Sequence, residues 1–436
     1  MGNNLSLKHS IFKYPQYITV SCLFFFISFL ITTQFKVAGL AIIGFLTLFI
    51  LYHLLIEKKI LLAKEDINVF ILFYLIHYIS LSAGSIINFF INGVLYMEYY
   101  PAIFGRMINI TVCMLFFIYV TNNKNKKELS TAIIFNSYFY GCCILLVFGL
   151  WQLSAMLFNV PYPDINTRDF IHSMDTTLLP VFINRRITSI ADEPAYLIPY
   201  LIDAIIIIFF TNKRKITIIP FVIVLLFSLS LSGYINFLIV TVVVFALKKM
   251  NKTKIITICL IVPIILYFII SQQNILISIF SRLNPEVLFK SVRLQEILLP
   301  IKFVFFNSSI FNQLFGYGPK GFGFISQFIF YKHGFLAGQN VTAETHIIFA
   351  DYLIEYGLIG LILIIALFIY LYIIARKTYN ITKNRLAQVL CINLFVTSLY
   401  TSDYASPRFT AIILLINILY KDCKSIRRYK EFNEWL

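Results

Sequence analysis

The chain has 436 residues, of which 59% are hydrophobic and only 13% are charged. A soluble domain carries roughly 25% charged residues, so this composition excludes an ordinary soluble protein and indicates a membrane protein. The formal net charge of +16 suggests a nucleic-acid partner, but the distribution of the basic residues along the chain argues against one.

Apolar runs long enough to cross about 30 Å of hydrocarbon recur through the sequence. We therefore predict an all-α polytopic integral membrane protein with about 12 transmembrane helices and short helices in two large outer loops. The first run is read as an uncleaved span, because no small-x-small cleavage site follows it. The predicted spans are 17–33, 37–55, 67–87, 103–120, 131–158, 195–210, 216–231, 234–247, 255–270, 347–375, 386–400 and 407–420.

Most of the 36 basic residues lie in alternate connections between these runs. This is the positive-inside pattern, which sets orientation and predicts that both termini are cytoplasmic. It accounts for the net charge without a nucleic-acid partner. The basic connections are 8–13, 58–64, 124–127, 213–215, 248–254, 376–385 and 421–430.

The two long connections, 159–194 and 271–346, then fall on the outer face, where loops of this length are usually functional. They divide the chain into five predicted regions. These are a five-helix membrane region 1–158, a first outer loop 159–194, a four-helix region 195–270, a second outer loop 271–346, and a three-helix region 347–436 with a basic cytoplasmic tail.

The first outer loop ends in Arg185 and Arg186 followed by Glu193-Pro194. Proline and an acidic residue suit the start of a helix, so the Glu-Pro pair has a structural explanation. The arginines run against the positive-inside bias, and a guanidinium grips a phosphate or pyrophosphate bidentately. We therefore expect Arg185 and Arg186 to contact such a ligand, and Glu193 to position an arginine or His346.

The second outer loop carries two candidate elements. Residues 286–299 have apolar side chains at helical spacing, so we expect a helix along the membrane surface that holds Arg293, with Arg282 upstream. Arg293 can instead form an exposed i,i+3 pair with Glu296. A glycine-rich turn follows at 316–323 and includes Tyr317 and Lys320; it can approach a sugar or phosphate, or be a plain turn. No βαβ unit surrounds it, which excludes a dinucleotide fold.

His346 lies where the second outer loop re-enters an apolar run, with Glu344, Asp351 and Glu355 near it in sequence. A histidine at such a border can do proton chemistry on a substrate outside the bilayer. The intramembrane polar residues Asp203, His53, His77 and Arg106 are interpreted as packing or cavity residues, or as the lining of a lipid-entry groove. Asp403 and Arg408 flank the last outer turn and are predicted to form an interfacial pair.

Three motifs resemble those of the bacterial O-antigen and capsular polysaccharide polymerases, a family related to the O-antigen ligases. They are an arginine-rich segment that leads to Glu-Pro (Arg186 to Glu193), a Gly-x-Gly turn in the second large outer loop (316–318), and a histidine separated by ten residues from Gly-Leu-Ile-Gly (His346 to 357–360). A polar residue commonly follows the histidine in that family, whereas this chain has Ile347.

The resemblance implies an integral glycosyltransferase of the bacterial cytoplasmic membrane. It would transfer a growing glycan from undecaprenyl pyrophosphate to the next carrier-linked repeat unit on the outer leaflet. Arg186, Arg293 and His346 would be catalytic, and Arg185, Glu193, Arg282, Tyr317, Lys320 and Glu344 would bind substrate. The implied partners are the carrier-linked oligosaccharide, membrane lipids, a chain-length regulator and a flippase. We expect neither a cofactor nor a metal.

Two other functions fit much of the sequence. An O-antigen ligase shares the fold but passes the glycan to the lipid A core, and the Arg186 to Pro194 segment favours a polymerase over it. A lipid-linked oligosaccharide flippase or other transporter predicts about 12 spans too, but with short outer loops and with charges buried in the bundle. The long, charged outer loops favour an enzyme over a transporter.

Overall fold

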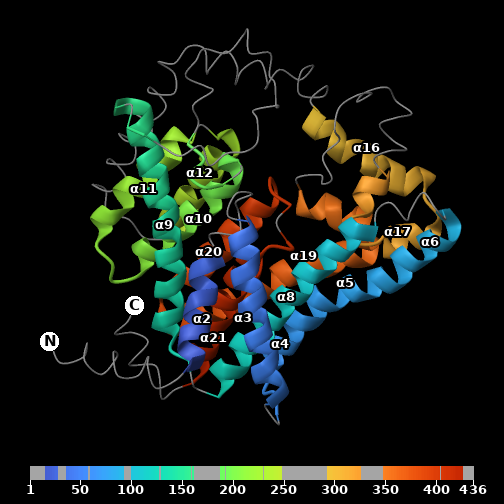
Figure 1. Ribbon diagram of the computed structural model, residues 1–436, viewed down its shortest axis with the longest axis horizontal. Coiled ribbons are helices and arrows are strands. Elements are labelled where there is room, and N and C mark those ends of the chain that lie inside the picture. Colours follow the sequence, from blue (N-terminus) through green and yellow to red (C-terminus); the bar gives the residue numbers. More distant parts are fainter. Residues whose placement is uncertain are drawn as a thin grey trace, which may run out of the picture.

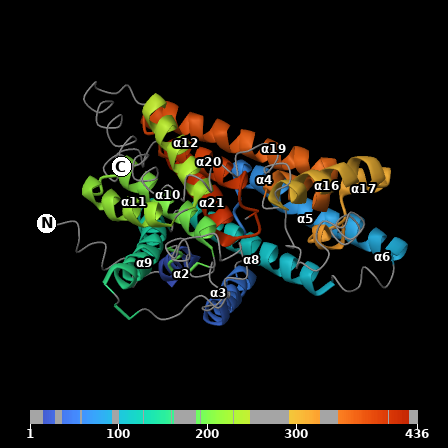
Figure 2. The same ribbon diagram turned by 90° about the horizontal axis from the view of Figure 1, so that it is seen from above.

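The computed structural model of the chain is helical, with no β-strand among the residues that it describes. Long helices lie side by side in a bundle, and α16 (Val292–Asn307) and α17 (Ile310–Phe315) lie beside one end of α19 (Figures 1 and 2). The described residues are 15–27, 36–56, 59–92, 100–126, 129–158, 160–161, 187–191, 193–228, 230–247, 292–325, 347–402 and 404–425.

The other helices follow the apolar runs in chain order. They are α2 (Pro15–Phe26), α3 (Lys36–Ile56), α4 (Lys64–Val69), η2 (Phe70–Tyr74), α5 (Leu75–Ser80), η3 (Leu81–Ser85), α6 (Ile86–Asn92), α8 (Tyr100–Asn125), α9 (Thr131–Phe158), α10 (Pro194–Phe210), η4 (Lys215–Thr217), α11 (Ile218–Phe227), α12 (Leu231–Leu247), α19 (Ile348–Thr382), α20 (Leu386–Ser398) and α21 (Pro407–Lys424). The elements from α4 to α6 form one continuous helical run with two π-helical segments, η2 and η3.

The predicted spans are helical over most of their described residues, with non-helical residues at 228, 230, 347 and 399–400, while the run 255–270 lies outside the described residues. Four helices in the described part are long and apolar enough to cross a bilayer: Lys64–Phe90, Tyr100–Asn125, Thr131–Phe158 and Ile348–Thr382. Others are shorter, such as α20 with 13 residues, which at 1.5 Å per residue covers only about 20 Å. The structure thus supports a helical membrane protein, and the full set of twelve spans stays a prediction.

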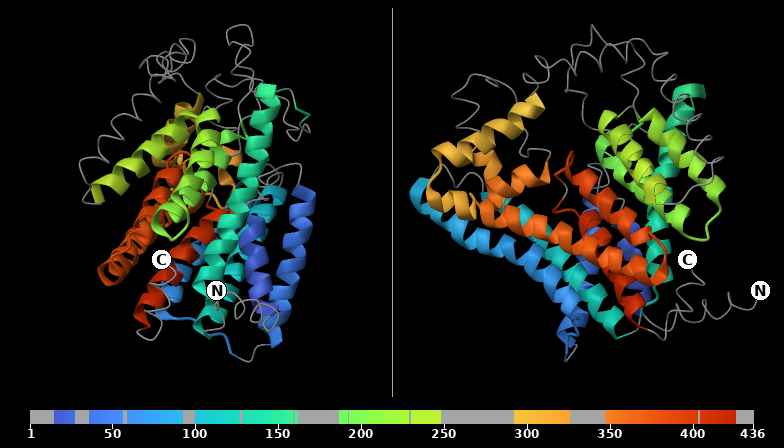
Figure 3. Two further views of the ribbon diagram at one scale, coloured as in Figure 1. Left: turned by 90° about the vertical axis from the view of Figure 1, so that its left-hand side faces the viewer. Right: turned by 180° about the vertical axis from the view of Figure 1, so that it is seen from behind.

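The surface helix expected at 286–299 corresponds in part to α16, which begins at Val292 and continues to Asn307. Its neighbour α17 begins at Ile310, and both pack against α19. Figure 3 shows α16 and α17 together at one side of the molecule. Several apolar side chains remain exposed on these two helices, including Phe306 and Ile310.

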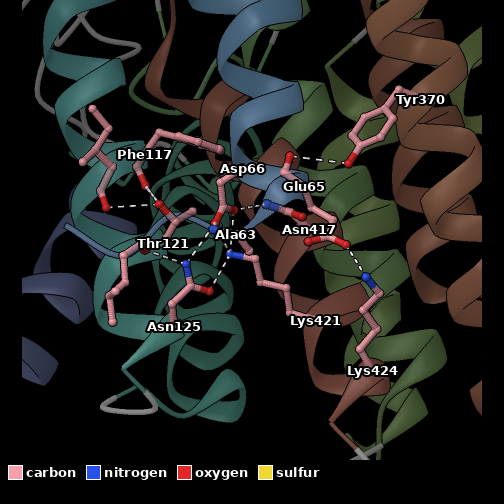
Figure 4. Close-up of polar contacts among 12 residues, drawn as sticks. Ala63, Glu65, Asp66, Phe117, Thr121, Asn125, Tyr370, Asn417, Lys421 and Lys424 are labelled. Carbon is pink, nitrogen blue, oxygen red and sulfur yellow. Dashed lines mark hydrogen bonds and ion pairs between the residues drawn. The ribbon is translucent and has the colours of Figure 1, made fainter. Parts of the chain in front are cut away.

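The basic connections that the structure describes meet at one end of the bundle. Asp66 is fully buried at the start of α4 and binds Lys421 of α21, with Nζ 2.5 Å from Oδ1. Asn125 and Asn417 donate to the same carboxylate, at 3.0 and 2.7 Å (Figure 4). Nearby, Lys424 pairs with Glu65.

Two further contacts bring the remaining described basic connections to this end. Lys213 donates to Asn136 in the second turn of α9, and Asn384 donates to the carbonyl oxygen of Phe210. We call this end the inner end, and the end that holds the turn 399–406 the outer end. The names follow the charge-based prediction, and the side of the membrane to which each end belongs stays a prediction.

A buried ion pair lies in the middle of the bundle. Asp203 of α10 and Arg408 of α21 are almost completely buried, and Nη2 of Arg408 lies 2.9 Å from Oδ2 of Asp203. Tyr138 of α9 and Asn393 of α20 each donate to this carboxylate at 2.7 Å. Four helices are therefore joined at one carboxylate.

This pair corrects one expectation. Arg408 is buried and paired with Asp203, so the interfacial position predicted for Arg408 is wrong, while Asp403 lies outside the described residues. The interpretation of Asp203 as an interior residue is confirmed. The arginine lies in the first turn of α21 and is 1% exposed, a burial that the hydropathy pattern does not reveal.

Replacing Arg408 by alanine should strongly destabilise the protein. The change leaves the Asp203 carboxylate buried without its cation, which typically costs about 3–5 kcal/mol. Thermal unfolding of the detergent-solubilised protein measures the loss. Lys424→Ala is the matched control, because Lys424 is half-exposed and its pair with Glu65 contributes about 1 kcal/mol or less. Equal losses in the two variants would contradict the central role of the buried pair.

Candidate functional site

The predicted site residues differ in how far the structure describes them. Arg293 lies in the first turn of α16, although its side chain is outside the described part. Glu193, Tyr317 and Lys320 are described in full. The remaining ones lie outside the described residues: Arg185, Arg186, Arg282, Glu344 and His346.

Residues 187–191, which directly follow Arg186, enter the bundle as a buried turn. The side-chain oxygen of Gln152 in α9 accepts from the backbone N–H groups of Thr188 and Ser189, at 2.9 and 2.8 Å. Ser189 has φ 57° and donates to the carbonyl of Leu145. The turn ends at Glu193, the N-cap of α10, with Pro194 in its first turn. The helix start predicted from Glu-Pro is confirmed.

Tyr317 is held by local contacts in the glycine-rich turn 316–323. Its side chain is 5% exposed, and its hydroxyl shares a hydrogen bond of 2.7 Å with Ser308. Burial raises the pKa of this hydroxyl above its usual value, so the phenol is neutral at physiological pH. Lys320 lies in a tight turn with φ 62° and is partly buried. Their predicted role in substrate binding stays a prediction.

α19 is broken near its outer end. Gly357 has φ 67° and ψ −166°, so the segment Ile348–Tyr356, which we call the arm, does not continue the axis of residues 358–382. Only glycine adopts this region readily, which explains why the break falls there. The arm begins two residues after His346.

Glycines from three segments meet at this break, and we call their meeting point the glycine junction. A Cβ on Gly316 would lie 2.3 Å from the carbonyl of Glu355, and one on Gly357 would lie 2.3 Å from the carbonyl oxygen of Leu314. A Cβ on Gly84 in η3 would lie 2.7 Å from the backbone N of Gly318. Three backbones therefore approach more closely than any side chain allows.

Hydrogen bonds follow from this close approach. The N–H groups of Tyr317 and Gly318 donate to the carbonyls of Ile354 and Glu355, at 2.9 and 3.0 Å. Ser80 of α5 donates to the Glu355 carbonyl at 2.7 Å. The two glycine motifs found in the sequence, 316–318 and 357–360, thus form one structural unit that docks the second outer loop onto α19.

The arm also carries a cluster of buried polar side chains. Asp351 accepts a hydrogen bond from Ser402, and Glu355 accepts one from Tyr404, both in the turn 399–406. Tyr356 shares a hydrogen bond with Tyr404 at 3.1 Å, and Tyr352 shares one with His77 at 3.2 Å. Both carboxylates are completely buried.

Two groups from neighbouring helices complete this cluster. The guanidinium of Arg106 in α8 lies 4.7 Å from the centre of the Tyr404 ring, which is a cation–π contact. The His77 ring of α5 stacks on Tyr404 at 5.7 Å. Arg106 and His77 are therefore interior residues, as expected. The three tyrosines were not predicted, although Tyr352 and Tyr356 stand at i, i+4 beside the carboxylates.

Side-chain contacts connect this cluster to the start of α10. Ser402 and Tyr404 bind the arm, while Tyr400 and Thr397 accept hydrogen bonds from Asn236 of α12. Gly233 of α12 lies against Ile198 of α10, so closely that a Cβ would be 2.0 Å from the Ile198 side chain. The described segments next to Arg186, Arg293 and His346 thus belong to one contiguous set of elements at the outer end.

No group of three or more His, Cys, Asp or Glu side chains that could hold a metal ion occurs in the described part of the chain. The ionisable groups of the cluster around the arm are two buried carboxylates, three phenols, one imidazole and one guanidinium. A scan of protein-family models and a search of curated protein sequences both give no match to the chain.

Alanine at Gly84, Gly316 or Gly357 should each destabilise the outer end, because a Cβ would overlap backbone atoms that cannot move independently. We expect a lower melting temperature and less folded protein in the membrane, with the largest loss at Gly316 and Gly357, where φ is also positive. Gly105→Ala is the control, since nothing lies within 4 Å of its Cβ position. Wild-type stability of all three junction variants would refute the close approach.

Proposed function

We propose that this protein polymerises lipid-linked oligosaccharide repeat units in the bacterial cytoplasmic membrane. It transfers the growing glycan from undecaprenyl pyrophosphate to the next carrier-linked repeat unit, on the outer leaflet. The observation that carries the proposal is the contiguity of the segments that adjoin Arg186, Arg293 and His346. Residues far apart in sequence can meet at one site only if their flanking segments do.

The proposed chemistry assigns a role to each of these residues. Departure of the lipid pyrophosphate builds negative charge, which Arg186 and Arg293 stabilise in the transition state. His346 accepts or orients the proton of the acceptor hydroxyl, as a histidine titrating near neutrality can. Arg185, Glu193, Arg282, Tyr317, Lys320 and Glu344 bind the substrate around these three.

The proposal includes a complete topology of about twelve spans with both termini in the cytoplasm. Its support is the gathering of the described basic connections at one end of the bundle. With the inner end in the cytoplasm, the arm and the glycine junction face the outer leaflet, where the lipid-linked substrates would arrive. A flippase and a chain-length regulator would act before and beside the protein.

A transporter of lipid-linked oligosaccharides is the second candidate, because a specific observation favours it. The described bundle buries Asp203 with Arg408, and Asp351 and Glu355 near Arg106, and intramembrane charges often line transport pathways. A ligase that passes the glycan to the lipid A core uses the same chemistry. Purified protein in liposomes distinguishes the three: a polymerase alone lengthens carrier-linked glycans when given only carrier-linked repeats.

Alanine at Arg186, Arg293 or His346 should abolish long glycans. Loss of a charge-stabilising contact slows the chemical step by about 10²–10³-fold, and loss of a general base by about 10²–10⁴-fold. Gel analysis of glycans from cells with each variant should show single repeats at normal protein abundance. Arg→Lys should rescue poorly, because an ammonium cannot replace the bidentate guanidinium. Wild-type glycan length at matched expression would rule out these three residues as the site.

Labelling with an impermeant thiol reagent tests the orientation, after the seven native cysteines have been replaced. Asn307→Cys, at the exposed end of α16, should react in intact cells. Arg214→Cys, at the exposed α10–α11 connection, should react only after lysis. The reverse pattern would overturn the topology and, with it, the outer-leaflet reaction.

A further inference from the structure

We propose that Tyr404 is a positioning residue that fixes the arm for the transfer reaction. The inference rests on the proposed function for its catalytic part. Its structural part rests on contacts between the turn 399–406 and the arm. The turn 399–406 is not part of any of the sequence motifs. Tyr404 itself does not touch the proposed substrate.

The arm depends on side-chain contacts for its direction. Because Gly357 interrupts the helix, the long segment 358–382 does not hold residues 348–356 in line by continued helical hydrogen bonding. The glycine junction holds the arm's main chain at Ile354 and Glu355, on the side of the second outer loop. The opposite side is held by the turn 399–406.

Tyr404 makes most of that second set of contacts. Its hydroxyl donates to Oε2 of Glu355 and shares a hydrogen bond with Tyr356. Its ring lies 4.9 Å from the Tyr352 ring, nearly perpendicular to it. On its other faces it meets the His77 ring and the Arg106 guanidinium, at 5.7 and 4.7 Å. One fully buried side chain therefore ties three residues of the arm to α5 and α8.

Glu355, which Tyr404 contacts, also links the arm to the outer-loop turn 316–318. Oε1 of Glu355 is buried without a hydrogen-bond partner, and Oε2 accepts from the Tyr404 hydroxyl, while the Tyr356 hydroxyl also lies within hydrogen-bonding reach of this carboxylate. The main-chain carbonyl of the same residue accepts from Gly318 and Ser80. Movement of Glu355 would therefore disturb the arm and the docked outer loop together.

Tyr404→Phe tests the proposal by two independent measurements. Amide hydrogen exchange of the purified protein should become faster in residues 348–356 and 316–318, and remain unchanged in 358–382. In the liposome assay, kcat should fall about 10- to 100-fold with little change in KM for the carrier-linked acceptor, because a displaced arm impairs the alignment needed for the chemical step more than it impairs binding. Tyr400→Phe is the control: it removes a turn hydroxyl bonded to Asn236 of α12 and should change neither measurement.

A double variant separates positioning from stability. Tyr404→Phe leaves the buried Glu355 carboxylate with one donor fewer, whereas Tyr404→Phe with Glu355→Gln also replaces the carboxylate by a neutral amide of the same shape, which depends less on the lost donor. The melting temperature should recover in the double variant, and kcat should not. Recovery of kcat together with the melting temperature, or unchanged exchange in the arm of Tyr404→Phe, would overturn the proposal. An inactive wild-type protein would instead reject the polymerase, and the exchange data would still decide how the arm is held.

Discussion

Charged and strongly polar side chains in this bundle have to find partners within the chain, because apolar helices surround them on most sides. The last described helix, α21, supplies such partners at several positions along its length. Arg408 near its start binds Asp203, Thr410 shares a hydrogen bond with Tyr74, and Lys421 near its end binds Asp66. Tyr404, just before α21, meets Glu355. A single C-terminal helix and the turn that precedes it thus connect α4, η2, α10 and α19.

The outer end is built on a second physical constraint, the absence of side chains at three glycines. Gly84, Gly316 and Gly357 allow three backbones to touch, so that the main-chain hydrogen bonds of an outer-loop turn replace those lost at the break in α19. The π-helical segment η3 that contains Gly84 belongs to the same contact, and such segments often occur at functional sites. Rigid backbone contacts of this kind position neighbouring side chains more precisely than flexible side chains do.

Hydropathy and charge predicted much of this fold. The apolar runs became helices, the Glu193-Pro194 pair begins α10, and the basic connections meet at one end. The sequence did not predict the partners of buried groups. Arg408 binds a residue 205 positions away, and Tyr404 meets the arm 49 positions away, distances at which no local pattern carries information. The meeting of the two glycine motifs was likewise hidden, because each motif reads as an ordinary turn or helix signal by itself.

The pair between Asp203 and Arg408 has a consequence for how the protein is made. Asp203 leaves the ribosome 205 residues before Arg408, which corresponds to roughly 10–40 seconds of synthesis at 5–20 residues per second. During that interval α10 contains a carboxylate whose guanidinium partner does not yet exist, and an unpaired charge is costly at the centre of a bilayer. On the proposed topology, in which α10 crosses the bilayer, its insertion therefore has to be assisted by the translocation machinery or by a chaperone until α21 arrives. Chains truncated before Arg408 would be natural targets for membrane quality control.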